Sequence, residues 1–374
     1  MMNDLDKLHL TANSIIGVVS TVIGLISLGI APSLVVQILG GFLVAVGFFF
    51  LLKARLRLRR PKSPYHLTPV TPPDFVGHNS LLRQLNEALQ KGESLSLVGE
   101  QRMGKTSLLK TWQLQLETTG GRKVAFVDGL KTAASLPEFI HAITLIPLNP
   151  PFSTGIIGGR KGGLGKLDNP EEAANVLQQW AVETAVQTGL PPLLLIDEAE
   201  CFLEQLPMRF FERLRGMLEQ LVVVLATSRE MNLVFAELGK TSPLSLRLLH
   251  LPLLDTHSSD KIIARGGFTA KQVELLKEWA GQHPFYLQLL GQCLIEARQA
   301  GERDKTALRH FQTNAAARFK KLWQTLTEQE QKLLQAACQS DNKIKRRSLI
   351  ERGLVTEDGQ LFGRVLKEWL TEQL

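Results

Sequence analysis

The spacing of apolar residues along this chain predicts short strands separated by amphipathic helices. Apolar runs at 94–98, 123–128, 191–198, 221–226 and 248–252 are read as strands. The third run is apolar without interruption up to the two acids that end it, and the fourth is apolar throughout, as expected of parallel strands that are buried on both faces. Stretches between them place apolar residues three and four positions apart, so the pattern favours an α/β sheet covered by helices.

The first sixty residues do not follow this pattern. Between Lys7 and Lys53 the chain carries no charged residue, and this run is far longer than the roughly 20 helical residues that cross one hydrocarbon core. Pro32 divides the run, so the sequence predicts a transmembrane hairpin with spans at 14–30 and 34–52. A cleaved signal peptide fits less well because the run is too long. A buried hairpin in a soluble protein would leave neither helix with a polar face for water.

Basic residues follow the apolar run directly. They are Lys53, Arg55, Arg57, Arg59, Arg60 and Lys62, whereas one lysine precedes the run. The positive-inside rule therefore predicts a two-span protein of the cytoplasmic (inner) membrane, with both ends in the cytoplasm. The basic cluster would contact the anionic headgroups of the lipid bilayer. We expect a hairpin domain at 1–60 and an extended proline-rich linker at 61–73.

A glycine-rich loop after the first strand of the predicted sheet matches the pattern G-x-x-x-x-G-K-[ST]. It consists of Gly99, Glu100, Gln101, Arg102, Met103, Gly104, Lys105 and Thr106, and Ser107 follows in a helix-like run. The glycines let backbone N–H groups point at phosphate oxygens, and the helix N-terminus adds partial positive charge. Lys105 would neutralise the β- and γ-phosphates, and the Thr106 hydroxyl would bind Mg²⁺. An ordinary glycine turn would not require all four fixed positions, so the loop predicts a nucleoside-triphosphate site.

Two acids end the third strand of the predicted sheet. Ligand groups in parallel sheets lie at the carboxyl ends of strands, which is where Asp197 and Glu198 stand. Asp197 would hold Mg²⁺ through water, and Glu198 would orient and polarise an attacking water. An acidic helix cap is the alternative interpretation. The fourth strand ends in a polar segment that includes Arg229, which would sense the γ-phosphate. The pattern predicts Mg²⁺-dependent hydrolysis of the triphosphate.

Two further features add no site. In the glycine-rich segment 158–166, Arg160 stands where a phosphate loop requires glycine and Lys166 precedes leucine, so we read 147–169 as a mobile basic loop. The three cysteines, at positions 201, 293 and 338, have the spacing of neither a metal site nor a disulfide framework. At 374 residues and a net charge of +7, the chain has room for two or three modules.

Residues 72–370 resemble the STAND branch of P-loop ATPases, close to AAA+ and archaeal-type ATPase domains. The most specific matches are the phosphate loop, the strand LLLIDE at 193–198, the triplet TSR at 227–229 and HPFYLQ at 283–288. The resemblance implies that ATP and ADP bind with Mg²⁺.

The resemblance also assigns contacts on the base side of the nucleotide. It implies that Phe75 and Val76 pack near the adenine, that Arg229 reads the terminal phosphate, and that Pro284 lies against the base and sugar. This chain departs from the family at His78, where the family usually has arginine, and at Gln282, where it commonly has glycine.

The same resemblance implies the domain order. It predicts a P-loop ATPase core at 74–254 with a parallel sheet in the order 5-1-4-3-2, a helical lid at 255–322 and a winged helix at 323–374. Local signals agree with the last unit, because 327–330 has the pattern of a capping box and a glycine-containing turn at 356–360 predicts a hairpin.

These features support three hypotheses of function. The first is a membrane-anchored ATP-dependent switch that forms a homo-oligomer in response to an unknown protein trigger, with the hairpin acting on the membrane in defence or signalling. The second is a membrane-tethered ATPase that binds DNA through Arg346, Arg347 and Arg352 on a recognition helix. The third is an ATPase that powers a membrane assembly or secretion machine.

Overall fold

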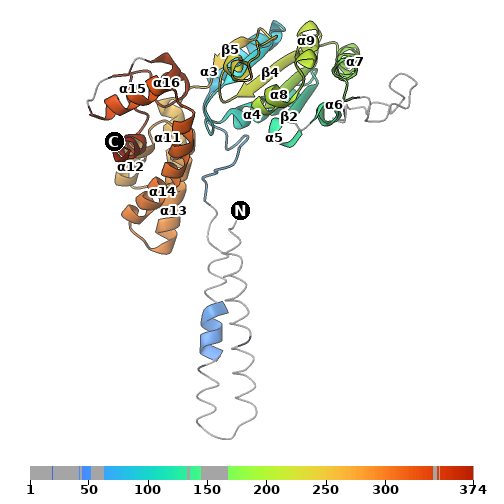
Figure 1. Cartoon of the computed structure of the whole chain (residues 1–374). Coiled ribbons are helices and arrows are strands. Elements are labelled where there is room, and N and C mark those ends of the chain that lie inside the picture. Colours follow the sequence, from blue (N-terminus) through green and yellow to red (C-terminus); the bar gives the residue numbers. More distant parts are fainter. Residues whose placement is uncertain are drawn as a thin grey trace. The chain divides into compact units, whose positions relative to one another are not determined.

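The structure is a computed structural model that describes residues 63–132, 135–144, 167–339, 343–344 and 346–373, together with Val19, Phe42 and 44–51. The chain divides into two compact units, 1–63 and 64–374, and all elements named below belong to the second unit (Figure 1). The basic segment at 53–62 lies outside the described residues. The predicted basic loop at 147–169 lies outside them except for its last three residues.

The transmembrane prediction requires correction. Within the described residues, no helix is long and apolar enough to cross a membrane. A span needs roughly 20 consecutive apolar helical residues, whereas the continuous helical segment described in the first unit is 44–51. This finding contradicts the predicted hairpin and the two-span membrane placement that followed from it. The remaining residues of the spans at 14–30 and 34–52 lie outside the described part of the chain.

The second unit contains a five-stranded sheet with the strand order β2-β3-β4-β1-β5, of which Figure 1 labels β2, β4 and β5. Each neighbouring pair is parallel. Read from the opposite edge this is the order 5-1-4-3-2, so the predicted sheet is confirmed. The strands are β1 (Leu95–Val98), β2 (Val124–Asp128), β3 (Leu193–Asp197), β4 (Val222–Thr227) and β5 (Arg247–His250).

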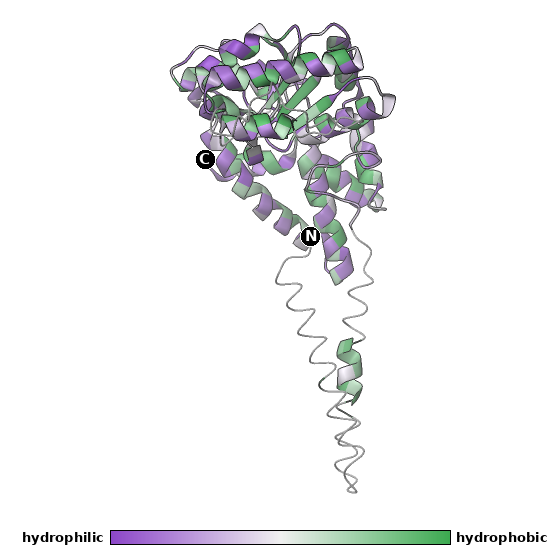
Figure 2. Ribbon diagram, turned by 90° about the vertical axis from the view of Figure 1, so that its right-hand side faces the viewer, coloured by the Kyte–Doolittle hydropathy of each residue, from purple (hydrophilic) through white to green (hydrophobic). Residues whose placement is uncertain are grey.

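Side chains on both faces of the central strands are apolar, which explains why both faces of the sheet are covered. Successive side chains of a strand point to opposite faces. Leu194 and Ile196 therefore pack into one hydrophobic core, while Leu193 and Leu195 pack into the other. Every residue of β3 and β4 is buried. Figure 2 shows these strands coloured as apolar and the covering helices coloured as mixed.

Helices cover both faces of the sheet. The core that includes Leu193 is closed by α3 (Asn79–Gln90) and α4 (Lys105–Thr119). The core that includes Leu194 is closed by a larger group of helices. These are α6 (Leu136–Thr144), α7 (Pro170–Thr188), α8 (Glu200–Gln205), α9 (Met208–Gly216) and α10 (Met231–Glu237), and the short α5 (Gly129–Thr132) follows β2.

The C-terminal helices share one hydrophobic core. They are α11 (Thr256–Ala264), α12 (Ala270–Ala280), α13 (Pro284–Ala300), α14 (Asp304–Gln324), α15 (Glu328–Gln339), α16 (Arg347–Glu351) and α17 (Arg364–Glu372). Two glycines let backbones meet here. A Cβ on Gly281 would lie 1.6 Å from the Phe362 carbonyl oxygen, and one on Gly363 would lie 2.5 Å from the Trp279 oxygen. Close packing thus explains why glycine stands at position 281, directly before Gln282.

Two local predictions for the last segment are confirmed. Thr327 and Glu330 form the capping box of α15, because the backbone N–H of each donates to the side chain of the other, at 3.0 and 3.3 Å. Val355 and Leu361 form an antiparallel bridge on either side of the predicted turn. The domain boundaries, and the winged-helix identity of 323–374, stay predictions.

Residues 65–70, which we call the strap, are packed against the C-terminal helices and the sheet part, although the prolines within 61–73 predict an extended linker. The Tyr65 hydroxyl donates to the carbonyl oxygens of Ile262 and Ile263 at 3.1 and 3.0 Å. Its ring stacks on Phe268 with centroids 5.9 Å apart and lies directly over Gly291 of α13. The strap is therefore anchored to α11 and α13 at its first residue.

We expect Gly291→Ala to release the strap. A Cβ at this position would lie 2.6 Å from the Tyr65 ring, and such overpacking costs about 1–3 kcal/mol. Gly216→Ala in α9 is the matched control, because nothing lies within 4 Å of its Cβ. The gain in helix propensity, at most about 1 kcal/mol, is shared by both variants. Chemical denaturation should show Gly291→Ala as the less stable of the two, with faster chymotryptic cleavage after Tyr65. Equal stability and equal cleavage would show that α13 does not hold Tyr65.

Candidate nucleotide site

The register of the sheet brings the polar strand ends to one edge. Asp128 of β2 pairs with Asp197 of β3, and Val98 of β1 pairs with Thr227 of β4. Because all pairs are parallel, the loop after β1 and the acids of β2 and β3 leave the sheet on the same side. This edge is where the predicted phosphate loop meets the predicted metal-binding acid.

The phosphate loop wraps around a buried ammonium group. Lys105 is 4% exposed, and its Nζ donates to the carbonyl oxygens of Gly99 and Glu100 at 2.8 and 3.5 Å. Gly104, directly before α4, has a φ of 104°, and Arg102 has a φ of 70°. Left-handed backbone at these positions turns the loop back around its own lysine.

Thr106 and Asp197 are joined by a short hydrogen bond. The Thr106 hydroxyl donates to Asp197 Oδ2 at 2.6 Å, while Asp197 Oδ1 is buried and has no hydrogen-bond partner among the described residues. Burial raises the pKa of the Asp197 carboxyl, against the opposing effects of the Thr106 hydrogen bond and the Lys105 charge. The orphaned oxygen and the hydroxyl are oxygen donors, which Mg²⁺ prefers.

Glu198 stands in a strained backbone position next to this pair. Its φ is 49°, in the left-handed region, which costs a non-glycine residue about 1–3 kcal/mol. Gly129 makes room for the turn, because a Cβ there would lie 2.4 Å from the Glu198 carbonyl oxygen. Burial raises the pKa of the Glu198 carboxyl, whereas the charge of Lys105 lowers it.

Most of the predicted site residues line one cavity of about 570 Å³. Its lining includes Phe75, Val76, Gln101, Arg102, Met103, Gly104, Lys105, Thr106, Ser107, Asp197, Glu198 and Pro284. Gly99 and Glu100 are outside the lining, although their carbonyl oxygens accept from Lys105. The base-side and phosphate-side residues, far apart in sequence, thus meet in one place.

Several lining residues were missed by the sequence analysis. They are His66–Val70 of the strap, Asp74, His78, Lys110, Asp128, Leu130, Lys131, Leu254, Ile262, Phe285 and Gln288. Asp128 gives a usable signal, since it ends a predicted strand as Asp197 does. His78 lines the cavity although it departs from the family pattern. Burial lowers the pKa of His78 to about 4, so its ring is neutral at neutral pH.

The strap forms one wall of the cavity. The backbone N–H of Val70 donates to Ser107 Oγ at 3.0 Å, and Arg102 Nη1 donates to the Leu67 carbonyl oxygen at 3.0 Å. The backbone N–H of His66 donates to Gln288 Oε1 at 3.1 Å. The strap therefore connects the phosphate loop to helix α13 across the cavity.

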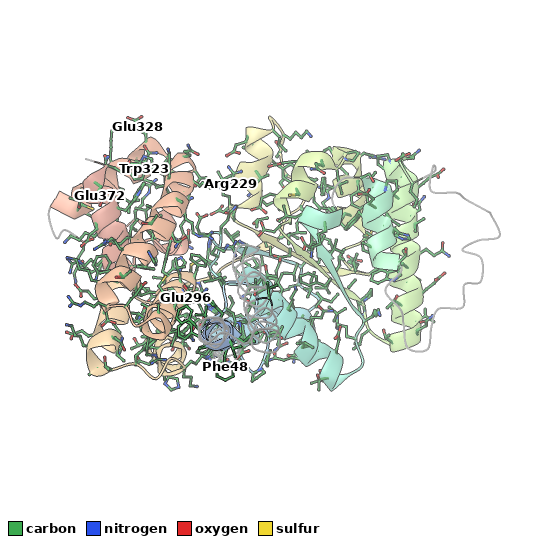
Figure 3. All side chains as sticks on the ribbon, turned by 90° about the horizontal axis from the view of Figure 1, so that it is seen from below. Phe48, Arg229, Glu296, Trp323, Glu328 and Glu372 are labelled. Atoms are coloured by element: carbon green, nitrogen blue, oxygen red, sulfur yellow. The ribbon has the colours of Figure 1, made fainter. Side chains whose placement is uncertain are left out.

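Arg229 is also a predicted site residue that lies outside the cavity lining. Its guanidinium pairs with Glu237 on α10, and it is outside the lining. Figure 3 shows Arg229 at the border between the sheet part and the C-terminal helices. The backbone N–H of its neighbour Ser228 donates to the Glu200 carboxylate.

The C-terminal helices contact the outer side of the phosphate loop. Arg352, directly after α16, donates to Glu100 Oε2 from Nε at 3.0 Å and from Nη2 at 2.7 Å. The two side chains are only 15% and 12% exposed. Next to this pair, a Cβ on Gly353 would lie 2.7 Å from the Met103 methyl carbon. The loop is thus in direct contact with an element 252 residues further along the chain.

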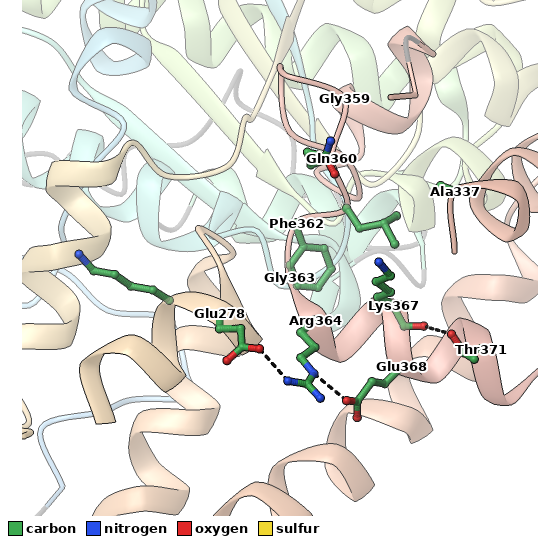
Figure 4. A pocket seen from close by; sticks show the side chains of 12 residues that line it. Glu278, Ala337, Gly359, Gln360, Phe362, Gly363, Arg364, Lys367, Glu368 and Thr371 are labelled. Carbon is green, nitrogen blue, oxygen red and sulfur yellow. Dashed lines mark hydrogen bonds and ion pairs between the residues drawn. The ribbon is translucent and has the colours of Figure 1, made fainter. Parts of the chain in front are cut away.

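A second cavity, of about 600 Å³, lies among the C-terminal elements. It is lined by residues of α12, α15, α17 and the turn before α17 (Figure 4). Arg364 crosses it and binds Glu278 and Glu368, each at 2.7 Å. The cationic group of Arg364 is thus already neutralised by two carboxylates.

The fold is similar to that of a solved Walker-type ATPase. A Walker-type ATPase of Pyrococcus abyssi superposes with a TM-score of 0.57 at 17% identity, covering 82% of this chain and 99% of that one. Cdc6p from Pyrobaculum aerophilum gives 0.46 at 14%, covering 82% and 98%, and Drosophila ORC bound to DNA gives 0.37 at 16%, covering 79% and 85%. No family model and no curated protein matches the chain. At these identities the first likeness shows a P-loop ATPase fold and nothing finer, and the other two are too low in TM-score to support an argument.

We expect Asp197→Asn to stabilise the nucleotide-free protein at neutral pH. Burial raises the pKa of Asp197, so its contribution to stability is fully present below the unfolded pKa of about 3.9 and is lost as pH rises through the raised folded value. The asparagine variant has no such group. Thermal unfolding in EDTA from pH 4 to 8 should show that the melting temperature of the variant, relative to that of the parent, increases as pH rises. The exposed Asp358→Asn is the control. A constant difference between Asp197→Asn and the parent across this range would contradict the expected charge burial.

Proposed function

We propose that this protein binds ATP with Mg²⁺, hydrolyses it slowly and acts as a nucleotide-dependent switch. The observation that carries the proposal is the convergence of Lys105, Thr106 and Asp197 in one cavity, with Thr106 hydrogen-bonded to Asp197 at 2.6 Å. A phosphate loop, a hydroxyl and a buried acid at one sheet edge are the parts that phosphoryl transfer needs. The P-loop ATPase fold is consistent with this function.

The roles of the site follow from its chemistry. The N–H groups of 101–107 and the Lys105 ammonium would bind the phosphates, because both present positive charge to the cavity. Thr106 and the unpartnered Oδ1 of Asp197 would hold Mg²⁺, which supplies charge neutralisation of the phosphates when bound. Glu198, whose carboxyl has a raised pKa, is the residue we assign to orient the attacking water.

The base side of the cavity fits a nucleoside. Phe75, Val76 and Pro284 supply apolar surface, and the neutral His78 adds a ring whose Nε2 has no hydrogen-bond partner among the described residues. Aromatic and apolar walls with a few polar groups are typical of small-molecule sites. Arg229 as a sensor of the γ-phosphate remains a proposal, and it requires the guanidinium to leave Glu237.

Contacts between the C-terminal segment and the phosphate loop support the switch. Glu100 belongs to the loop and Arg352 belongs to 323–374, which we infer to be a winged helix from its helices and single hairpin bridge. A nucleotide that shifts the loop would change this ion pair, and a movement of the C-terminal segment would change the loop. We infer that the ADP-bound state favours this closed contact. The ATP-bound state, together with a protein trigger, favours its release and the formation of a homo-oligomer.

No observation among the described residues specifically favours the DNA-binding hypothesis. Arg352 is bound to Glu100 and Thr325, and Arg347 is bound to Glu351 at 2.6 Å. Of the three arginines expected on a recognition helix, two are thus paired within the protein, while Arg346 is exposed. An arginine that neutralises a carboxylate is not available to a phosphate in the same arrangement.

We expect Lys105→Ala to abolish ATP binding and Glu198→Gln to retain binding while turnover falls at least about 100-fold. The first variant removes the cation of the loop, and the second replaces a base by an amide of the same shape. Radiolabelled ATP binding and phosphate release with Mg²⁺ measure the two effects. Glu219→Gln, at an exposed position, is the control. Parental turnover in Glu198→Gln would remove Glu198 from the mechanism, and parental binding in Lys105→Ala would remove the proposed site.

We expect Arg352→Ala to open the contact with the phosphate loop and to speed ADP release by at least about tenfold. Hydrogen bonds between charged groups contribute about 1.5–3 kcal/mol, and 1.4 kcal/mol corresponds to tenfold. Arg346→Ala removes the same charge at an exposed position six residues earlier and should release ADP at the parental rate. Stopped-flow displacement of a fluorescent ADP analogue gives both rates. If the two variants release ADP equally fast, the Glu100–Arg352 pair does not control the site.

A further inference from the structure

A histidine and two glutamates from three separate elements meet beside β5. Glu230 precedes α10, His250 ends β5 and Glu351 ends α16. One ligand atom from each lies within 4.8 Å of the others, and among the described residues this is the group of three that can hold a metal ion. It is distinct from the nucleotide cavity, whose lining contains none of the three.

His250 has no hydrogen bond to either ring nitrogen. Both Nδ1 and Nε2 are shielded from solvent, and neither has a hydrogen-bond partner among the described residues. A buried polar atom left unpaired costs about 1–3 kcal/mol, so such atoms normally have a partner. Nε2 lies 3.3 Å from Glu351 Oε1, close enough for an ion pair but without hydrogen-bond geometry.

The two carboxylates near His250 have too few neighbouring cations to balance their negative charge. Arg347 binds Glu351 at 2.6 Å, but it is 87% exposed and so is strongly screened. Glu230 makes no ion pair in the part of the chain that the structure describes, although it lies beside another acid. Two carboxylates held together by the fold are stabilised when a cation binds between them.

The ligand types and their spacing fit zinc. Imidazole nitrogen and carboxylate oxygen are common Zn²⁺ ligands, and three protein ligands leave a fourth position for water. Bonds of about 2.0–2.1 Å in a tetrahedron place neighbouring ligand atoms about 3.3 Å apart. The distance between His250 Nε2 and Glu351 Oε1 already has this value.

We propose that Glu230, His250 and Glu351 form a divalent metal site, suited to Zn²⁺, that fixes α16 to the sheet edge. The bond would join an element of the C-terminal segment to the strand next to β1. Glu351 is adjacent to Arg352, whose side chain binds the phosphate-loop residue Glu100. Metal binding at this site would therefore stabilise the contact between the C-terminal segment and the sheet part. The Glu100–Arg352 pair stabilises the same contact through other residues.

Titration of the full chain with Zn²⁺ tests the site. The protein is stripped with EDTA, freed of chelator and nucleotide, and titrated with zinc chloride in a calorimeter. We expect one ion per chain and a rise in melting temperature. His250→Ala and Glu351→Gln should each weaken binding at least about tenfold and lose the thermal shift. His310→Ala, at an exposed position on α14, should behave like the parent.

Further variants and a second metal separate binding at this site from binding elsewhere on the chain. Circular dichroism checks that each variant is folded, and Glu230→Gln provides a third variant outside α16. Co²⁺ in place of Zn²⁺ should give no thiolate charge-transfer absorption, because no cysteine is among the ligands. Stoichiometric binding that persists unchanged in His250→Ala, a thiolate band, or no stoichiometric binding to the parent would each overturn the proposal.

Discussion

The parallel register of the sheet is the constraint on which the site depends. It forces five strand ends, with their polar residues, to one edge, where burial would make an unpaired charge costly. The chain meets this cost with local partners: the loop carbonyls for Lys105 and the Thr106 hydroxyl for Asp197. Asp197 nevertheless retains one unpartnered oxygen and is only 3% exposed. This edge of the sheet therefore keeps a buried carboxylate oxygen that no described residue of the protein contacts by a hydrogen bond.

The sheet and the phosphate side of the site were predictable because their signals are local. A strand that is buried on both faces must be apolar throughout, so β3 and β4 are evident from the sequence, as are the acids that end β3. The phosphate loop requires fixed residues within eight positions. The capping box at Thr327 and Glu330 requires two residues three apart. In each case the residues that make the structure are close together in the chain.

Other features depend on partners that are distant in sequence, and the sequence alone does not reveal them. The prolines within 61–73 predict an extended linker. The packing of Tyr65 is not evident from the sequence, because its partners are the backbone carbonyls of Ile262 and Ile263, which any residue type provides. Arg229 is expected from its strand to face a phosphate, but Glu237, on the next helix, supplies a nearer carboxylate. The apolar N-terminal run is interpreted from length and composition, and the absence of a sufficiently long apolar helix in the described residues contradicts that interpretation. His250 and Glu351 likewise have no common motif.

The strap also limits the order in which the parts of the protein can fold. Tyr65 and its hydrogen-bond partners are 197 and 198 residues apart in the chain. Loop closure over such a separation is entropically costly, and contacts of this kind form late. During synthesis the strap leaves the ribosome long before α11 exists. Its docking must therefore wait for the sheet and the C-terminal helices, so a newly made chain acquires the covered cavity only in a late folding step. A chain interrupted before α11 would have the phosphate loop but not the wall that closes over it.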